Sequence, residues 1–196
     1  KARLFRQYPH GPHAAHLLGY IGRISAKDQD RIEELDQTNN YRGTAYIGKD
    51  GLEKRYETEL HGRTGFEEVE TSAGGRAVRV LSRSPAVPGN NLMLSIDIRL
   101  QDAAEKALAG KRGALVAIDT RNGDILAMVS APSFDPNLFV EGIDSENWKL
   151  LNESIDRPLL NRPLSGTYPP GSTFKPFMAL AALEKGFRTA STVLRD

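Results

Sequence analysis

Residues 168–176 read YPPGSTFKP, and an apolar run, FMALAAL, follows at 177–183. Two prolines and a glycine stiffen and turn the chain, so a new element should begin here. Because proline is tolerated only in the first turn of a helix, Pro176 fixes the helix start just ahead of the apolar run. We therefore predict that Ser172 lies at the N-terminus of a helix that continues to about Lys185, with Lys175 on the same face.

This spacing suits nucleophilic catalysis. A serine hydroxyl is a poor nucleophile until a base takes its proton, and a lysine acts as that base only when it is neutral. Burial near apolar or cationic groups lowers a lysine pKa, and the partial positive charge of a helix N-terminus acts in the same direction. Ser172 is therefore the candidate nucleophile and Lys175 the candidate general base. Alone, an S-x-x-K pattern is more often a capping serine followed by a solvated lysine, so the surrounding sequence decides.

Upstream of this segment the sequence predicts a hairpin and a helix. Residues 114–119 (ALVAID) and 125–130 (ILAMVS) flank Asn122-Gly123, a strong hairpin signal because both turn residues can adopt positive φ. Both strands are apolar on two faces, which indicates central strands of a helix-covered sheet. Asp97 is a good N-cap for a helix over 98–109, whose apolar stripe comprises Leu100, Ala103, Ala104, Ala107 and Leu108.

The first part of the chain predicts short elements. These are a strand over 17–24, helices over 27–35 and 50–60, a hairpin of strands 66–71 and 77–82, and a strand face at 92–96. In the helix over 50–60, Leu52, Tyr56 and Leu60 share one face. Prolines and a glycine within 85–89 mark a linker. The stretch 132–168 is expected to be mostly loop, with a short helix at 146–151.

Composition limits the possible functions. The 196 residues include no cysteine, which excludes disulfides and thiolate chemistry. Their net charge of +1 gives no long-range electrostatic field that would attract nucleic acid. No apolar stretch approaches the roughly 20 residues of a membrane span, and residues 1–8 do not resemble a signal peptide. Because the chain begins at Lys1, we expect it to be a processed piece of a longer protein.

Two further groups of polar residues are weaker candidates. His10, His13 and His16 recur at intervals of three, but Gly11 and Pro12 break any helix between the first two, so we expect no metal site. Three glutamates, at 67, 68 and 70, are expected to form a solvated strand face rather than an acid–base pair. No cofactor is expected.

Longer segments around the S-x-x-K pattern show a family resemblance. PLLNRPLSGTYPPGSTFKPFMALAALE resembles the active-site segment of the penicillin-binding protein and serine β-lactamase superfamily, and the class B penicillin-binding proteins in particular. The resemblance extends over ALVAIDTRNGDILAMVSAPSFDP and APSFDPNLFVEGI. Upstream it includes YPHGPHAAHLLGYIGRIS and IGKDGLEKRYETELHGRTGFEEVE, so it covers nearly the whole chain, and the elongation-type enzymes are the best match.

The resemblance implies an activity and its residues. Ser172 would attack the penultimate D-Ala carbonyl of a peptidoglycan stem peptide, with Lys175 as general base, and β-lactams would acylate the same serine. Asn161 and Arg162 resemble a family N-R-A, with Pro163 in place of the alanine, and only a supporting role is carried over. The implied location is the periplasm, with an anchor in the bacterial inner membrane upstream of Lys1. The implied partners are a SEDS-type glycosyltransferase and an MreC-type scaffold.

The same resemblance implies an α+β fold in two parts. Residues 1–88 would form the non-catalytic pedestal (dimerisation-type) domain, and residues 89–196 the first part of a transpeptidase domain. The family's S-x-N and K-[ST]-G motifs have no match that could complete the pocket. We therefore expect the chain alone to be inactive and the segment after Ser130 to be poorly ordered, rearranged or covered by another chain. The alternative function is a pedestal that binds a scaffold protein, and a serine β-lactamase fits less well.

Overall fold

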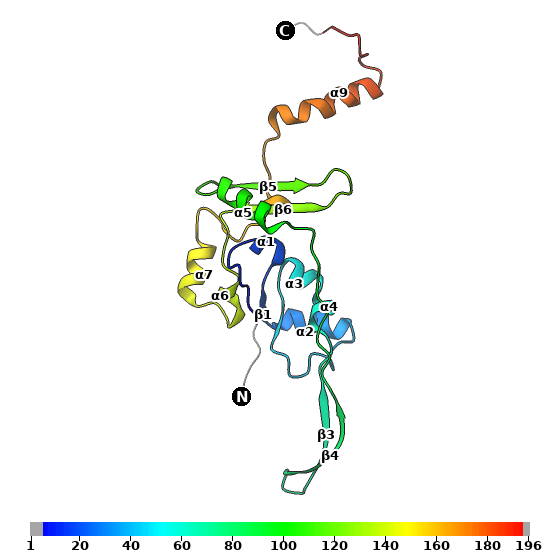
Figure 1. The fold of residues 1–196 in the computed structure, drawn as a ribbon, viewed down its shortest axis with the longest axis vertical. Coiled ribbons are helices and arrows are strands. Elements are labelled where there is room, and N and C mark those ends of the chain that lie inside the picture. Colours follow the sequence, from blue (N-terminus) through cyan, green and yellow to red (C-terminus); the bar gives the residue numbers. More distant parts are fainter. Residues whose placement is uncertain (1–5, 194–196) are drawn as a thin grey trace. The chain divides into compact units, whose positions relative to one another are not determined.

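The computed structural model describes residues 6–193, which form two compact units, one up to Ser165 and one from Gly166 (Figure 1). In the first unit the elements are, in chain order, α1 (Ala15–Leu18), β1 (Ile21–Arg23), α2 (Ala26–Glu34), β2 (Tyr46–Gly48), α3 (Gly51–Arg55), α4 (Glu57–His61), β3 (Phe66–Thr71), β4 (Ala77–Ser84), α5 (Ile98–Ala107), β5 (Gly113–Ile118), β6 (Ile125–Ala131), α6 (Asn137–Val140), α7 (Ser145–Asn152) and α8 (Arg162–Ser165). The second unit contains the 3-10 turn η1 (Gly171–Phe174) and α9 (Lys175–Glu184). The expected α+β class is confirmed.

The described strands pair into three separate antiparallel hairpins or ribbons: β1 with β2, β3 with β4, and β5 with β6. The strand predicted over 17–24 is half wrong, because α1 occupies its first residues. The chain turns after α1 at Gly19, whose φ is +77°. A Cβ at this glycine would stand 1.9 Å from the carbonyl oxygen of Asp50, so glycine is required by space as well as by conformation.

The helices predicted over 27–35 and 50–60 have different outcomes. Helix α2 begins after Ser25, whose side chain accepts from the Asp28 backbone N–H while the Asp28 carboxylate accepts from the Ser25 backbone N–H. The single helix predicted over 50–60 is wrong, because the chain breaks at Tyr56 into α3 and α4. The predicted apolar face is not the buried one either: Glu53 and Glu57 are buried, whereas Tyr56 is exposed.

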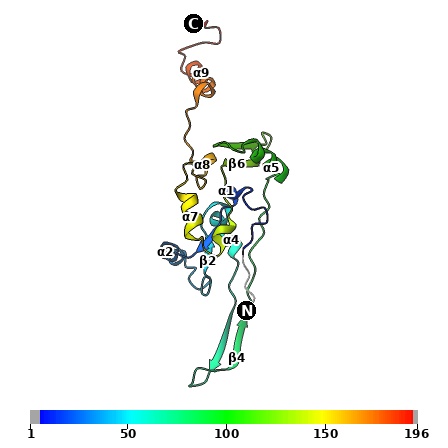
Figure 2. The same cartoon turned by 90° about the vertical axis from the view of Figure 1, so that its left-hand side faces the viewer.

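Strands β3 and β4 form the predicted hairpin, and every residue of both strands is exposed. Figures 1 and 2 show it apart from the other elements of the first unit. Two bulges interrupt its pairing, between Glu68 and Val69 and between Glu70 and Thr71. The glutamates of β3 face solvent as predicted, where Glu70 pairs with Arg79 at 2.6 Å and Glu67 with Arg83 at 3.2 Å.

The strand predicted at 92–96 is wrong, because this segment forms no ladder with another strand. It is held by single hydrogen bonds instead. The Asn90 N–H donates to Glu59 O at 2.7 Å, and the Asp97 N–H donates to Leu126 O at 3.0 Å. Scattered bonds of this kind leave no alternating pattern of partners, so the apolar alternation at 92, 94 and 96 misled the prediction.

Helix α5 packs on the β5–β6 hairpin and gives the first unit one of its two cores. Asp97 caps it as predicted, accepting from the backbone N–H groups of Arg99 and Leu100. The helix contributes Ala104 and Leu108 to a cluster with Leu115, Ala127 and Val129. The predicted stripe was rotated, since Leu100 is exposed and Gln101 is fully buried.

The pairing of β5 with β6 is confirmed, but two details of the prediction are wrong. Asp119 and Asp124 close a four-residue loop, and of its last two residues only Gly123 has positive φ. Among the described strands none extends this pair into a larger sheet. The outer face of β5 is correspondingly open, with Val116 and Ile118 exposed.

The second core joins the N-terminal segment to residues far along the chain. Ala15, Phe134 and Phe139 are buried together, with Tyr20 and Leu159 packed against them. Tyr20 stacks on Phe139 with ring centroids 4.0 Å apart. Of the three alternatives expected for the chain after Ser130 (poorly ordered, rearranged or covered by another chain), the first is wrong as far as Ser165, because α6 to α8 and their loops belong to the packed first unit. The other two stay predictions. The helix predicted at 146–151 is α7.

Candidate functional site

The segment with the candidate nucleophile folds as the sequence predicts at its end and differently at its start. Ser172 lies in the 3-10 turn η1, which runs directly into α9. The α-helix itself begins at Lys175 rather than near Ser172, because Pro176 occupies its first turn. It ends at Glu184, one residue before the predicted end.

Local bonds explain the tight turn. Gly171 has a φ of +53°, a conformation that favours glycine, and it follows directly on Pro170. The Thr173 hydroxyl and the Thr173 N–H both donate to the carbonyl oxygen of Pro170. The four residues that follow Pro170, those of η1, are thereby wound before the helix starts, and the chain enters α9 without a side-chain cap.

Ser172 and Lys175 are one turn apart. The Lys175 N–H donates to the carbonyl oxygen of Ser172. Residues three apart in a 3-10 turn lie above each other, so the two side chains leave the turn on the same side. In the described part of the chain, no hydrogen bond joins the hydroxyl of Ser172 to the side-chain nitrogen of Lys175.

Helix α9 is apolar and has no buried residue. Its large side chains are half or more exposed in most cases, including Phe177 at 67% and Leu180 at 63%. An apolar helix is normally covered on several sides, so α9 has the composition of a core helix. Within the described residues of the second unit taken by itself, nothing buries a residue of α9.

Asn161 and Arg162 tie the end of the first unit to its core. The Asn161 amide donates to the carbonyl oxygen of His16 at 3.0 Å. Arg162 is buried, and its guanidinium donates to the carbonyl oxygens of Asp156 at 2.5 Å and Arg157 at 3.2 Å. These contacts are structural.

The three N-terminal histidines have separate surroundings. His16 is buried, its Nε2 lies 2.7 Å from the carbonyl oxygen of Pro158, and its ring meets Phe134 edge-on. Burial lowers the pKa of His16 below its ordinary value. His13 lies instead against Glu105, with Nδ1 2.5 Å from Oε2. Within the described part of the chain, no three histidines or carboxylates are grouped as a metal site.

Two buried carboxylates were missed by sequence reasoning. Glu53 accepts from the Tyr8 hydroxyl at 3.1 Å and pairs with Arg6 at 2.9 Å. Burial, followed by the nearby charge of Glu53, raises the pKa of Tyr8. Glu57 accepts from the Tyr41 hydroxyl at 2.8 Å and from the Gly48 N–H at 2.7 Å. The only available signal was the interval of four between the two glutamates in a helical segment, which usually marks a solvated face.

Comparison with known proteins agrees with this architecture. The family model of the penicillin-binding protein dimerisation domain matches residues 1–94, and that of the penicillin-binding protein transpeptidase domain matches residues 113–196. The Ser172 segment lies inside the second match. The chain therefore belongs to the penicillin-binding proteins, with a dimerisation domain followed by transpeptidase-domain sequence.

Within that family the chain is similar to the MrdA or PBP2 type. It is 47% identical over its whole length to the peptidoglycan D,D-transpeptidase MrdA of Acinetobacter baumannii, of which it spans 29%. It is 45% identical over 97% of its length to MrdA of Escherichia coli K12, of which it spans 30%.

Solved structures of PBP2 have the same fold. The structure of Pseudomonas aeruginosa PBP2 in complex with WCK 5153 matches with a TM-score of 0.81 and 47% identity, over 97% of this chain and 37% of that one. The complex of PBP2 and MreC from Helicobacter pylori matches with a TM-score of 0.82 and 36% identity, over 96% of this chain and 34% of that one. The chain thus spans about a third of the proteins it resembles.

Proposed function

We propose that the protein containing this chain is a peptidoglycan D,D-transpeptidase that cross-links stem peptides during cell elongation and is acylated by β-lactams. The observation that carries the proposal is the S-x-x-K sequence of η1 and α9, inside residues that match the transpeptidase family model. The names of the MrdA relatives support the reaction class. Residues 1–88 would be the pedestal domain and 89–196 the first part of the catalytic domain.

In the proposed reaction Ser172 is the nucleophile and Lys175 the general base. The lysine amine takes the serine hydroxyl proton as Oγ bonds to the carbonyl carbon of the penultimate D-Ala. The C–N bond to the terminal D-Ala breaks, and the leaving amine takes up a proton. An amine of a neighbouring stem peptide then attacks the ester, forms the new amide bond and returns Ser172 to its hydroxyl form. With a β-lactam, the reaction would stop after the first step, when Ser172 is acylated.

The oxyanion needs donors that the helix start can supply in part. The backbone N–H of Ser172 is at the beginning of the η1–α9 segment, and N–H groups there are not used by the helix. The remainder of the pocket would come from the family's S-x-N and K-[ST]-G motifs. These 196 residues contain no K-[ST]-G, and their S-x-N match, Ser145-Glu146-Asn147, precedes Ser172 and lies in α7 of the first unit. We therefore expect the separate chain to react with penicillin slowly or not at all.

The proposed location is the periplasm, with an inner-membrane anchor. No helix in residues 6–193 has the length and apolarity to cross a bilayer. The proposed partners are an MreC-type scaffold, supported by the PBP2–MreC complex from Helicobacter pylori, and a SEDS-type glycosyltransferase. A scaffold-binding pedestal without catalysis is the alternative function, and the names of the D,D-transpeptidase relatives do not favour it.

Labelling with a fluorescent penicillin tests the proposal on the full-length protein. The protein should form a stoichiometric adduct on Ser172, located by mass spectrometry of the peptide that contains it. Ser172→Ala should abolish the adduct, and Lys175→Ala should slow its formation by about a hundredfold or more. Thr173→Ser is the matched control, because it keeps the hydroxyl that donates to Pro170. A full-length protein without an adduct on Ser172 would leave only the scaffold-binding function.

A further inference from the structure

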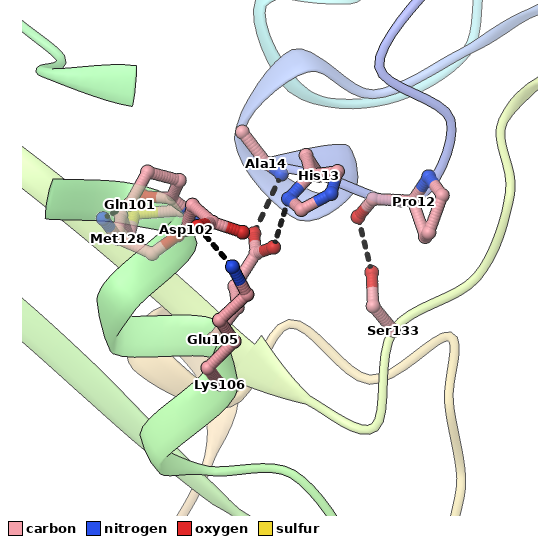
Figure 3. Close-up of polar contacts among 9 residues, drawn as sticks. All are labelled: Pro12, His13, Ala14, Gln101, Asp102, Glu105, Lys106, Met128 and Ser133. Atoms are coloured by element: carbon pink, nitrogen blue, oxygen red, sulfur yellow. Dashed lines mark hydrogen bonds and ion pairs between the residues drawn. The ribbon is translucent and has the colours of Figure 1, made fainter. Parts of the chain in front are cut away.

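Glu105 on α5 holds three groups from two parts of the chain (Figure 3). Its Oε1 accepts from the Ala14 N–H at 2.9 Å and from the Gln101 amide at 2.7 Å. Its Oε2 lies 2.5 Å from His13 Nδ1. His13 and Ala14 belong to the residues that match the dimerisation domain.

Gln101, which also bonds Glu105, forms hydrogen bonds with the backbone of β6 through its side chain, as a neighbouring strand would through its backbone. Its side chain has no exposed surface. The side-chain oxygen Oε1 of Gln101 accepts from the Met128 N–H at 2.8 Å, and its side-chain nitrogen Nε2 donates to the Met128 carbonyl at 2.9 Å. Met128 lies in the residues that match the transpeptidase domain. Glu105 and Gln101 therefore link the N-terminal segment to β6 through consecutive hydrogen bonds.

The N-terminal segment is held in an uncommon conformation where Glu105 binds it. Ala14 has a φ of +54°, which non-glycine residues rarely adopt and which persists only where surrounding contacts enforce it. A second bond acts beside the first, since the Ser133 hydroxyl donates to the carbonyl oxygen of Pro12 at 2.8 Å. The segment 12–14 is thus bound by α5 and by the chain that leaves β6.

From β6 the connection continues toward the end of the first unit. The Ser130 hydroxyl, in β6, donates to the carbonyl oxygen of Leu160 at 2.8 Å and accepts from the Arg162 N–H at 3.1 Å. Arg162 opens α8, the last element before the chain passes into the residues around Ser172. A continuous series of short polar contacts therefore runs from Ala14 through Glu105, Gln101 and β6 to α8.

We propose that Glu105 is a positioning residue that makes the geometry of β6 and α8, and through them acylation at Ser172, depend on the N-terminal segment of the dimerisation domain. The inference rests on the proposed acylation for its kinetic test only. Removal of the carboxylate would release Ala14 and leave the Gln101 amide with one partner fewer, so β6 would lose its fixed spacing from α5. Glu105 touches no substrate in this scheme.

The experiment compares variants of the full-length protein by the rate constant of acylation at saturating fluorescent penicillin and by amide hydrogen exchange. Glu105→Ala should lower that rate constant about tenfold, with little change in the half-saturating concentration, because a displaced catalytic segment affects the step more than the binding. Glu105→Gln should stay close to the parent protein, since an amide oxygen still accepts from Ala14. Asp102→Asn is the matched control, because Asp102 pairs only with exposed Lys106 on the same helix.

A second control separates positioning from general destabilisation. Ile32→Ala removes a buried side chain from α2, outside the Glu105 contacts, and should lower the melting temperature without lowering the acylation rate constant. In Glu105→Ala, exchange should accelerate about tenfold at the Ala14 and Met128 amides together. Unchanged exchange at Met128, an unchanged acylation rate, or an equal loss in Ile32→Ala would each overturn the inference. If the parent protein forms no adduct, the proposed function fails instead, and hydrogen exchange alone decides whether Glu105 couples the two parts.

Discussion

The buried amide of Gln101 provides a sharp test of how α5 and β6 hold together. Gln101→Ala leaves the N–H and the carbonyl of Met128 without their partners in a buried strand. Each buried group that loses its partner costs about 1–3 kcal/mol, so we expect a loss of about 3 kcal/mol in the free energy of unfolding. For a chain of this size that loss lowers the melting temperature by about 6–12 °C.

Two further variants separate hydrogen bonding from packing. Gln101→Met keeps the volume but neither donor nor acceptor, so it should lose nearly as much stability as Gln101→Ala. Gln101→Glu keeps the acceptor for Met128 N–H but turns a carboxylate oxygen toward the Met128 carbonyl and toward Glu105, and it should be the least stable of the three. Asp102→Ala is the control on the same helix, where an exposed pair contributes well under about 1 kcal/mol.

Urea denaturation followed by circular dichroism, with all variants of the 196-residue chain at one pH, measures these differences. The reasoning is refuted if Gln101→Met is as stable as the parent chain, because packing alone would then account for the contribution of this side chain. It is refuted equally if Gln101→Ala loses no more stability than Asp102→Ala.

Three further predictions concern titration and buried charge. Burial lowers the pKa of His16. The stabilising contribution of the neutral ring is therefore present above about pH 6.5 and is lost as pH falls below that value. In urea titrations, His16→Phe should flatten the decline in the free energy of unfolding between about pH 7 and 5. Burial alone would raise the pKa of Asp28, but hydrogen bonds from Lys49 and Ser25 outweigh it and lower the pKa to about 2. The contribution of Asp28 is therefore lost as pH falls from about 4 to 2, and Asp28→Asn should remove that part of the acid transition seen by circular dichroism. Glu57→Ala should lower the free energy of unfolding, measured by urea denaturation, by about 2 kcal/mol because the Gly48 N–H loses its acceptor. The control, Glu59→Ala at an exposed position, should change it by no more than about 0.5 kcal/mol. Equal losses in the two variants would contradict this role for Glu57.

Elements with local signals were the ones that sequence reasoning found. Asp97 and Ser25 are capping residues next to the helices they begin, and the loop before β6 contains a glycine that adopts positive φ. Each of these signals acts within a few residues, so it survives whatever the rest of the chain does. The same holds for Pro176, which located the start of the helix after Ser172 to within one turn.

The errors occurred where a distant partner decides the structure. Glu53 is buried against Arg6 and Tyr8, and Glu57 against Tyr41. These partners lie elsewhere in the sequence, so the periodicity of residues 50–60 does not predict them. For the same reason, the apolar stripe predicted for the helix over 98–109 does not include the fully buried Gln101. The candidate nucleophile was found because its motif is local, while the roles of Ser172 and Lys175 remain predictions that the labelling experiment tests.

The bulges of the β3–β4 hairpin have a consequence for solubility. An exposed two-stranded ribbon presents free backbone edges that can template the addition of another chain and start aggregation. The extra residues opposite Glu68–Val69 and Glu70–Thr71 kink β4 and interrupt a regular edge. Charged side chains beside these kinks, including Arg79 and Arg83, further oppose stacking of like ribbons. A ribbon with regular pairing and the same exposed valines would be expected to form fibrils far more readily.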